Sequence, residues 1–273
     1  MTTISLNGRI AVVTGASRGI GKGIAEGLGE AGVTVYVTGR SSESDTTSPL
    51  TIEATARSVS AFGGHGIACR VDHCSDAEVE ALFARVEKEQ GRLDILVNNA
   101  YQIPDPPVLG GGFWEHPLSI WDVQCGVGLR GYYSAAYYAA PLMVAARSGL
   151  IVNISSRGGR EYVFSASYGV GKAGVDRMAK DMALELRAYN VAALSLSPSK
   201  VKTEFILDMV AKGQMQLDPA TAQSVRLSGR CIAALAADPA IMQRSGQILT
   251  VAEVASHYGV IDPDREIAAK KPA

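Results

Sequence analysis

The chain has 273 residues, of which 47% are hydrophobic and 19% are charged, and its formal net charge at pH 7 is −1. A chain of this length can bury one substantial core, so the composition indicates a globular protein. Lysine and arginine are not concentrated in any stretch, and this near-neutral balance argues against a nucleic-acid-binding surface.

Signals for export, for a membrane span and for metal binding are weak. Residues 1–9 lack the basic start and apolar run of a secretory signal, and the best candidate for a membrane span, residues 131–146, is too short. The four cysteines form no CxxC pair and predict reduced thiols. The potential metal ligands within residues 65–74 alternate along a predicted strand and would not converge on one ion. We therefore expect a cytoplasmic protein with neither a membrane span nor a metal.

Apolar strands alternate with amphipathic helices along the chain, which is the pattern of a parallel sheet covered by helices. The predicted strands are 10–14, 33–38, 66–71, 95–97, 150–154, 191–196 and 247–251. The predicted helices are 19–31, 50–62, 76–90, 119–146, 168–189 and 221–237. This order predicts an α/β fold with a single doubly wound parallel sheet, helices on both of its faces, and one domain over residues 1–273.

Three segments without periodicity, 41–49, 101–117 and 199–218, follow predicted strands. Ligands of an open parallel sheet bind beyond the carboxyl ends of its strands, so we expect these segments to frame a site. The loops 101–117 and 199–218 are expected to form the rim of a substrate site. Their apolar residues indicate an apolar pocket, with Phe113, Trp114, Phe205, Ile206 and Met209 as candidates.

The predicted helix 119–146 carries almost no charge in its second half. A helix that is apolar on every side must be covered on every side, and the sheet can cover only one. We therefore expect a homodimer or homotetramer formed through the helices 119–146 and 168–189.

A glycine-rich turn, Thr14-Gly15-Ala16-Ser17-Arg18-Gly19-Ile20-Gly21, joins the first predicted strand to the first predicted helix. Glycine permits a positive φ in a tight turn and lets the backbone approach a pyrophosphate, while the helix N-terminus supplies N–H donors for the anion. The turn predicts a nucleotide phosphate site, although its spacing alone also fits an ordinary strand-to-helix turn.

The end of the second predicted strand indicates which nucleotide binds. Enzymes for the unphosphorylated dinucleotide usually carry Asp or Glu about twenty residues after the glycines. Here Gly39 occupies that place, Arg40 follows it, and Arg18 lies in the glycine turn. Two guanidinium groups suit a 2′-phosphate, so the sequence favours NADP(H). Asp72 could accept a hydrogen bond from the adenine amino group, and Asn98 could fix the backbone beside the ribose.

Tyr168 is the only tyrosine followed four residues later by a lysine, Lys172, and both lie on one face of a predicted helix. A neighbouring cation lowers the pKa of a phenol, so Tyr168 is a candidate proton donor. Ser155 and Ser156 end the fifth predicted strand at the same edge of the sheet. Taken alone, the tyrosine–lysine spacing also fits a pair on a solvated helix.

Together these motifs resemble the short-chain dehydrogenase/reductase family over residues 8–250. The resemblance rests on the turn 14–21, Asn98-Asn99-Ala100, Ser155-Ser156, Tyr168-x-x-x-Lys172 and the stretch 198–203. It implies a Rossmann fold in which Ser156 holds the substrate oxygen, Tyr168 passes a proton and Lys172 binds the nicotinamide ribose. The candidate cofactor-binding residues are Gly15, Ser17, Arg18, Gly19, Ile20, Gly21, Arg40, Asp72, Asn98, Ala100, Tyr168, Lys172, Pro198, Val201 and Thr203.

Two departures from the family pattern precede this site in the chain, one in the predicted helix 119–146 and one directly after Asn98-Asn99-Ala100. Gly128 stands where the family carries a catalytic asparagine. We hypothesise that Gly128 leaves room for water and that Gln124, one turn earlier, supplies an amide. Tyr101 replaces a glycine, and we expect its ring to close part of the site.

Two further departures concern the serines and the nicotinamide pocket. Ser156 and Tyr168 are one residue closer than is usual in the family, so Ser155 stays an alternative for holding the substrate oxygen. Pro198-Ser199 replaces Pro-Gly, which we expect to alter the nicotinamide pocket.

The expected function is NADPH-dependent reduction of an aldehyde or ketone, or the reverse oxidation of an alcohol, with Tyr168 as proton donor. The alternative is a catalytically impaired NADP(H)-binding sensor or scaffold, which Gly128 motivates. A sugar-nucleotide epimerase or dehydratase typically has a different glycine pattern and a larger substrate domain, and this chain has neither feature.

Overall fold

The computed structural model describes residues 4–270, and the chain divides into two compact units. Unit 1 takes its described residues from Met1–Arg70, Pro198–Pro239 and Thr250–Ala273, and unit 2 consists of Val71–Ser197 and Ala240–Leu249. Each unit is built from parallel strands and the helices that follow them, so each can be described by itself.

The strands are continuous apolar runs. Those of unit 1 are β1 (Ile10–Val13), β2 (Thr34–Gly39) and β3 (His65–Arg70). Those of unit 2 are β4 (Ile95–Asn98), β5 (Gly149–Ile154) and β6 (Val191–Ser197). With β7 (Ile248–Thr250) they form a seven-stranded sheet in the order β3-β2-β1-β4-β5-β6-β7.

Strand β1 pairs in parallel with β2, β2 with β3, β4 with β5, and β5 with β6. Nearly every residue of β1, β4, β5 and β6 is buried, as expected where helices cover both faces of a parallel sheet. The predicted α/β fold with a doubly wound parallel sheet is confirmed.

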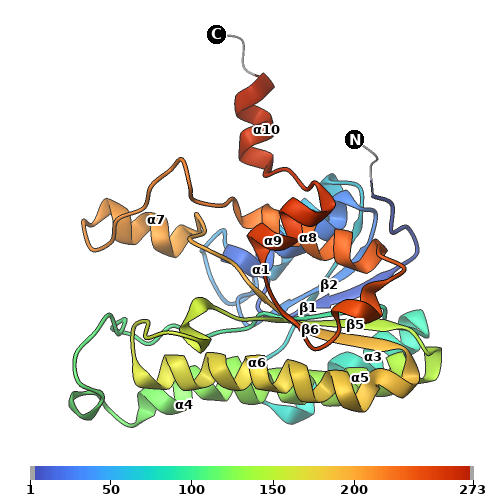
Figure 1. The fold of residues 1–273 in the computed structure, drawn as a ribbon, viewed down its shortest axis with the longest axis horizontal. Coiled ribbons are helices and arrows are strands. Elements are labelled where there is room, and N and C mark those ends of the chain that lie inside the picture. The colour runs from blue at the N-terminus through green and yellow to red at the C-terminus, as the bar shows by residue number, and fades with distance from the viewer. Residues whose placement is uncertain (1–3, 271–273) are drawn as a thin grey trace. The chain divides into compact units, whose positions relative to one another are not determined.

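The helices of unit 1 are α1 (Gly19–Glu30), α2 (Ile52–Ala61), α7 (Glu204–Ala211), α8 (Val225–Ala237), α9 (Val251–Tyr258) and α10 (Pro263–Lys270). α1 packs against α8, beside which it lies in Figure 1. A Cβ atom on Gly23 would lie 2.2 Å from the carbonyl oxygen of Val225, and one on Gly27 would lie 2.7 Å from the amide nitrogen of Arg230. The two backbones therefore meet directly, and only glycine permits this approach.

The helices of unit 2 are α3 (Asp76–Gln90), α4 (Ser119–Cys125), α5 (Gly131–Ala146) and α6 (Ala166–Leu186). A π-helical turn, Gly126–Arg130, joins α4 to α5, so the helix predicted over 119–146 is continuous but locally widened. Ser165 caps α6 by accepting a hydrogen bond from the backbone N–H of Tyr168. α5 and α6 run side by side in this unit (Figure 1).

The expectation of irregular chain over 199–218 is wrong where α7 forms. Thr203 caps this helix, because its hydroxyl oxygen accepts a hydrogen bond from the N–H of Ile206 over 3.2 Å. The helix predicted over 221–237 begins later, at Val225, and the last strand ends at Thr250, which opens α9 through a capping box with Glu253. Within the described chain, no helix has both the length and the hydropathy needed to cross a bilayer.

Candidate active site

Tyr168 lies in the first turn of α6, opposite the serine that follows β5. Ser156 Oγ accepts a hydrogen bond from the N–H of Gly158 over 3.1 Å, and both this oxygen and the ring of Tyr168 lie within 3.6 Å of the position that a Cβ atom on Gly158 would take. Ser155 Oγ, by contrast, is buried and has no hydrogen-bond partner among the described residues. Of the two serines considered from the sequence, the structure therefore brings Ser156 to Tyr168.

Close neighbours fix the ring of Tyr168. A Cβ atom on Gly158 would lie 2.5 Å from Tyr168 Cε1, so the turn after β5 reaches the ring only because this residue is glycine. The rings of Phe164 and Tyr101 meet it edge-on, with centroids 5.3 and 5.9 Å away. Sequence reasoning missed Gly158 and Phe164. The Gly158-Gly159 pair directly after the serines was an available signal, whereas nothing in the sequence marks Phe164.

Burial raises the pKa of Tyr168 above its ordinary value, while the hydrogen bond with Ser156 and the positive charge of Arg157 act to lower it. This differs from the expectation that Lys172 lowers the pKa of this phenol. The ammonium group is engaged elsewhere, because Lys172 Nζ donates a hydrogen bond to the carbonyl oxygen of Ile154 over 3.0 Å. The stabilisation of a phenolate therefore comes from Ser156 and Arg157.

The ammonium group of Lys172 is buried between aromatic faces. Nζ lies 5.2 Å from the ring centroid of Tyr101 and 5.7 Å from that of Tyr132, both within the range of a cation–π interaction. Burial lowers the pKa of Lys172 to about 8, and the charge of Asp176, one turn along α6, opposes this. Asp176 is itself buried, and its carboxylate oxygens have no hydrogen-bond partner among the described residues.

Asn98 ties the end of β4 to the elements that carry Lys172. Its Nδ2 donates hydrogen bonds to the carbonyl oxygen of Tyr132 over 3.2 Å and to Asn153 Oδ1 over 2.9 Å. The hydroxyl of Tyr132 in turn donates to the carbonyl oxygen of Ile154 over 3.3 Å, the same oxygen that holds Lys172. The backbone that Asn98 fixes is therefore that of α5, at Tyr132.

The hypothesis that Gly128 leaves room for water is wrong. A Cβ atom on Gly128 would lie 2.8 Å from Tyr101 Cδ2, because the ring of Tyr101 already fills that place. The narrow space bounded by Tyr101, Gln124, Gly128, Tyr168 and Lys172 has no volume that a water molecule could occupy. Tyr101 therefore does close this part of the site, which the side chain of Gln124 also lines.

The glycine-rich turn of unit 1 has the backbone that a phosphate site needs. Gly15 and Gly19 have φ angles of +65° and +58°, in the left-handed region that favours glycine. The N–H of Ala16 donates to the carbonyl oxygen of Thr38 over 2.8 Å, which anchors the turn to β2. α1 then begins at Gly19, so its first N–H groups point out of the helix at this turn.

A carboxylate already accepts a hydrogen bond from the first N–H group of α1. The N–H of Gly19 donates a hydrogen bond to Glu204 Oε2 over 2.9 Å, and Glu204 is the first residue of α7. Thr203 lies beside it, with its Cγ2 atom 3.6 Å from the Cβ position of Gly19. The turn therefore accepts an anionic oxygen through the N–H of Gly19.

The two arginines expected to select NADP(H) lie at one end of β2. β2 ends at Gly39, so no carboxylate stands at its last position. Arg18 Nη2 donates a hydrogen bond to Ser41 Oγ over 2.9 Å, which holds this guanidinium next to the segment that carries Arg40. Both arginine side chains are exposed, and the glycine turn and these cations in unit 1 fit the phosphate groups of a dinucleotide.

The other candidate cofactor residues are divided between the units. In unit 1, Pro198 follows β6 and Val201 pairs with Gln223 in an isolated bridge. In unit 2, Ala100 is buried, and Asp72 Oδ1 accepts a hydrogen bond from the N–H of Cys74 over 2.9 Å. Among residues 4–270, no group of three acidic, cysteine or histidine side chains is placed to hold a metal ion.

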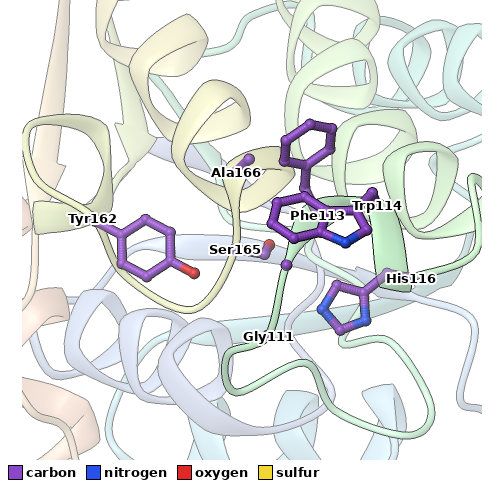
Figure 2. A pocket seen from close by; sticks show the side chains of 8 residues that line it. Gly111, Phe113, Trp114, His116, Tyr162, Ser165 and Ala166 are labelled. Carbon is purple, nitrogen blue, oxygen red and sulfur yellow. The ribbon is translucent and has the colours of Figure 1, made fainter.

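Loop 101–117 forms a pocket of about 420 Å³ at the start of α6. In Figure 2, Ser165 lies between Tyr162 on one side and Trp114 on the other. Phe113 and Trp114 pack edge-on at 5.3 Å and remain 72% and 75% exposed. The apolar residues expected from 199–218 lie in α7 of unit 1 instead. The lining residues are Gly111, Gly112, Phe113, Trp114, His116, Tyr162, Ser165 and Ala166.

Comparisons with known proteins agree on one family. The model of the short chain dehydrogenase family matches residues 9–212. Dehydrogenase/reductase SDR family member 1 of Mus musculus is 44% identical over 271 residues, which cover 95% of this chain and 84% of the relative. The 3-oxoacyl-[acyl-carrier-protein] reductase of Synechocystis sp. is 31% identical over 250 residues, which cover 90% of this chain and 96% of the relative. A crystal structure of a short-chain type dehydrogenase/reductase from Mycobacterium marinum has a TM-score of 0.77 at 25% sequence identity. The match covers 91% of this chain and 95% of that structure's chain.

Proposed function

We propose that this chain, which belongs to the short chain dehydrogenase family, is an NADP(H)-dependent reductase of aldehydes or ketones that also oxidises the corresponding alcohols. When bound, the nicotinamide supplies or accepts the hydride. The residues of the chain then have three tasks, which are to hold the carbonyl oxygen, to provide a proton and to bind the cofactor.

The placement of Ser156 beside Tyr168 carries the proposal. When the carbonyl carbon takes up hydride, its π electrons move to oxygen, and negative charge develops there. Ser156 would donate a hydrogen bond to that oxygen, and Tyr168 would transfer its hydroxyl proton to it, which completes the alcohol. Arg157 would then stabilise the phenolate left on Tyr168, because its charge lowers the pKa of this phenol.

The remaining assignments follow the family resemblance and the structure of each unit. Unit 1 would hold the phosphates at the glycine turn, with Arg18 and Arg40 on the 2′-phosphate. In unit 2, Lys172 would bind the nicotinamide ribose, Asp72 would bind the adenine amino group, and Ala100 would contact the cofactor. The pocket beside Ser165 would take the apolar part of the substrate, because Phe113, Trp114 and Tyr162 offer it exposed aromatic faces.

The variant Tyr168→Phe tests the proton donor. We expect it to bind NADPH as the wild type does and to lose turnover by a factor of about 10² to 10⁴ on a panel of aldehydes and ketones, followed by NADPH absorbance. Tyr189→Phe is the matched control, because Tyr189 lies in the turn after α6, is 41% exposed and is not part of the pocket lining. Unchanged turnover in Tyr168→Phe would refute the role of this residue.

The variant Arg40→Ala tests the cofactor. We expect the dissociation constant of NADPH to rise by about tenfold, the size of one charge-assisted contact, while that of NADH stays unchanged. Arg85→Ala is the control for loss of charge, because Arg85 pairs with Glu89 on the surface of α3. An equal loss of affinity for NADPH and NADH would show that Arg40 does not contact the 2′-phosphate.

The alternative function is an NADP(H)-binding sensor or scaffold. The alignment of Ser156 with Tyr168 supports catalysis, since a protein that only binds a nucleotide has no need of it. A wild type that binds NADPH but reduces no compound of the panel would favour the alternative.

We further propose one domain over residues 1–273, a cytoplasmic location, and a homodimer or homotetramer formed through the helices 119–146 and 168–189.

A further inference from the structure

We infer that Tyr101 is a positioning residue of this site: its ring, seated on Gly128 and held by Gln124, keeps the Lys172 ammonium group and the Tyr168 ring in place and excludes water from both. The inference rests on the proposed function, because the two side chains act as a pair only if they serve the reaction. It concerns two positions that depart from the family pattern, Tyr101 and Gly128, and it makes them partners.

Gly128 admits the ring. A Cβ atom on Gly128 would lie 2.8 Å from Tyr101 Cδ2 and 3.3 Å from Cε2, well inside the ~3.5–4.0 Å at which carbon atoms attract. Even alanine would therefore displace the ring. Gly126 lies in the same π-helical turn, but a Cβ atom there would meet nothing within 4 Å. The requirement for glycine is specific to the position that faces Tyr101.

Gln124 holds the hydroxyl. Its Oε1 atom accepts hydrogen bonds from Ser165 Oγ over 3.2 Å and from Ser167 Oγ. The amide oxygen is thereby used, so the NH₂ group is the part available to the hydroxyl of Tyr101, whose ring lines the same narrow space and whose pKa this side chain acts to lower. Burial raises the pKa of Tyr101 far above its ordinary value, so its hydroxyl stays neutral. Gln124 thus fixes Tyr101 relative to the first turn of α6.

The ring of Tyr101 in turn covers Lys172 and Tyr168. It lies 5.2 Å from Lys172 Nζ and meets the Tyr168 ring edge-on. The other groups that face Lys172, Tyr168 or Tyr101 come from several elements: Tyr132 from α5, Asp176 from α6, Cys125 from α4 and Arg157 from the turn after β5. Tyr101 belongs to the loop after β4, so its removal leaves a ring-sized opening next to the ammonium group through which water can reach it.

The pH dependence of the reaction distinguishes positioning from mere folding. Water that reaches Lys172 raises its pKa from about 8 toward its ordinary value of 10.5. Tyr101→Ala should therefore move the alkaline limb of kcat/KM for NADPH upward by at least one pH unit and lower kcat at least tenfold. Gly128→Ala should act in the same direction, and Gly126→Ala should leave both quantities unchanged. In the Tyr101→Ala background, Gly128→Ala should add nothing.

The ionisation of Lys172 can also be read without any activity. In protein labelled with ¹³Cε-lysine, the Lys172 resonance, identified by its loss in Lys172→Arg, should titrate near pH 8 in the wild type and at least one unit higher in Tyr101→Ala. If neither the Lys172 titration nor the pH profile shifts in Tyr101→Ala, the inference is overturned. If the Lys172 titration shifts in Tyr101→Ala but the wild type reduces no carbonyl, the placement of Tyr101 is supported and the proposed function is refuted. If Tyr101→Ala does not fold, the contrast between Gly128→Ala and Gly126→Ala decides.

Discussion

Lys172 is a cation that the fold holds where a cation is poorly solvated. Burial lowers its pKa from 10.5 to about 8. Below pH 8 both the folded and the unfolded chain carry the charge, but only the folded chain has removed it from water. A shift of this size corresponds to roughly 3 kcal/mol of lost stability. Between pH 8 and 10.5 the folded protein releases its proton first, so this loss disappears as the pH rises.

Lys172→Met should therefore give a more stable but inactive protein. At pH 7 we expect the free energy of unfolding in urea to increase by up to about 3 kcal/mol, with the lost hydrogen bond to Ile154 subtracting about 1 kcal/mol. The gain should vanish above pH 10.5. Lys180→Met on the exposed face of α6 is the control and should stay within about 0.5 kcal/mol of the wild type. A less stable Lys172→Met at pH 7 would contradict the argument.

The residues that could be predicted are those whose partners are near in sequence. Tyr168 and Lys172 share a helix face, and the left-handed φ of Gly15 and Gly19 follows from the tightness of their turn. Tyr101 could be expected to close the site, but its place above Gly128 could not be predicted, because the two residues lie on separate elements and only packing brings them together.

The same division holds for the elements. The strands were predicted to within one or two residues, because parallel strands buried on both faces are continuous apolar runs. α7 was missed, since its eight residues follow a loop rich in polar residues and only the cap at Thr203 marks its start. The contact of α1 with α8 was also missed, although Gly23 and Gly27 recur at the helical period. Periodicity in small residues is the signal that was available there.

α7 has a consequence for the affinity of the cofactor. It brings Glu204 to the N-terminus of α1, where its carboxylate accepts the N–H of Gly19 that a phosphate would need. An anion that binds here must displace this carboxylate and overcome its negative charge. Glu204→Gln should therefore bind NADPH about three- to tenfold more tightly, as measured by isothermal titration calorimetry.

The control for this prediction is Asp208→Asn. It removes one negative charge from the same helix, but Asp208 is exposed and pairs with Lys212 away from the turn. We expect no more than a twofold change in the affinity of this variant for NADPH. If Glu204→Gln bound NADPH no better than Asp208→Asn did, the carboxylate at Gly19 would not compete with the cofactor.

At the scale of the molecule, the order of elements determined more than any motif. Strands alternating with helices predicted the α/β class and the doubly wound sheet, and the strand order agrees. The association of subunits depends on what the fold leaves uncovered. In α5, Tyr133 and Tyr137 remain 56% and 64% exposed, and α6 beside it exposes Leu184. An apolar face of this kind on a helix pair is typical of a contact between subunits.

The double variant Tyr133→Asp/Tyr137→Asp tests this surface. Two carboxylates placed at the centre of a symmetric interface would face their own copies and lose hydration, so we expect a homodimer or homotetramer to dissociate toward monomers. Size-exclusion chromatography with light scattering at micromolar concentration measures the change, and Tyr162→Asp, an equally exposed tyrosine outside α5 and α6, should leave the mass unchanged. A monomeric wild type, or a double variant that assembles as the wild type does, would refute a subunit interface at this face.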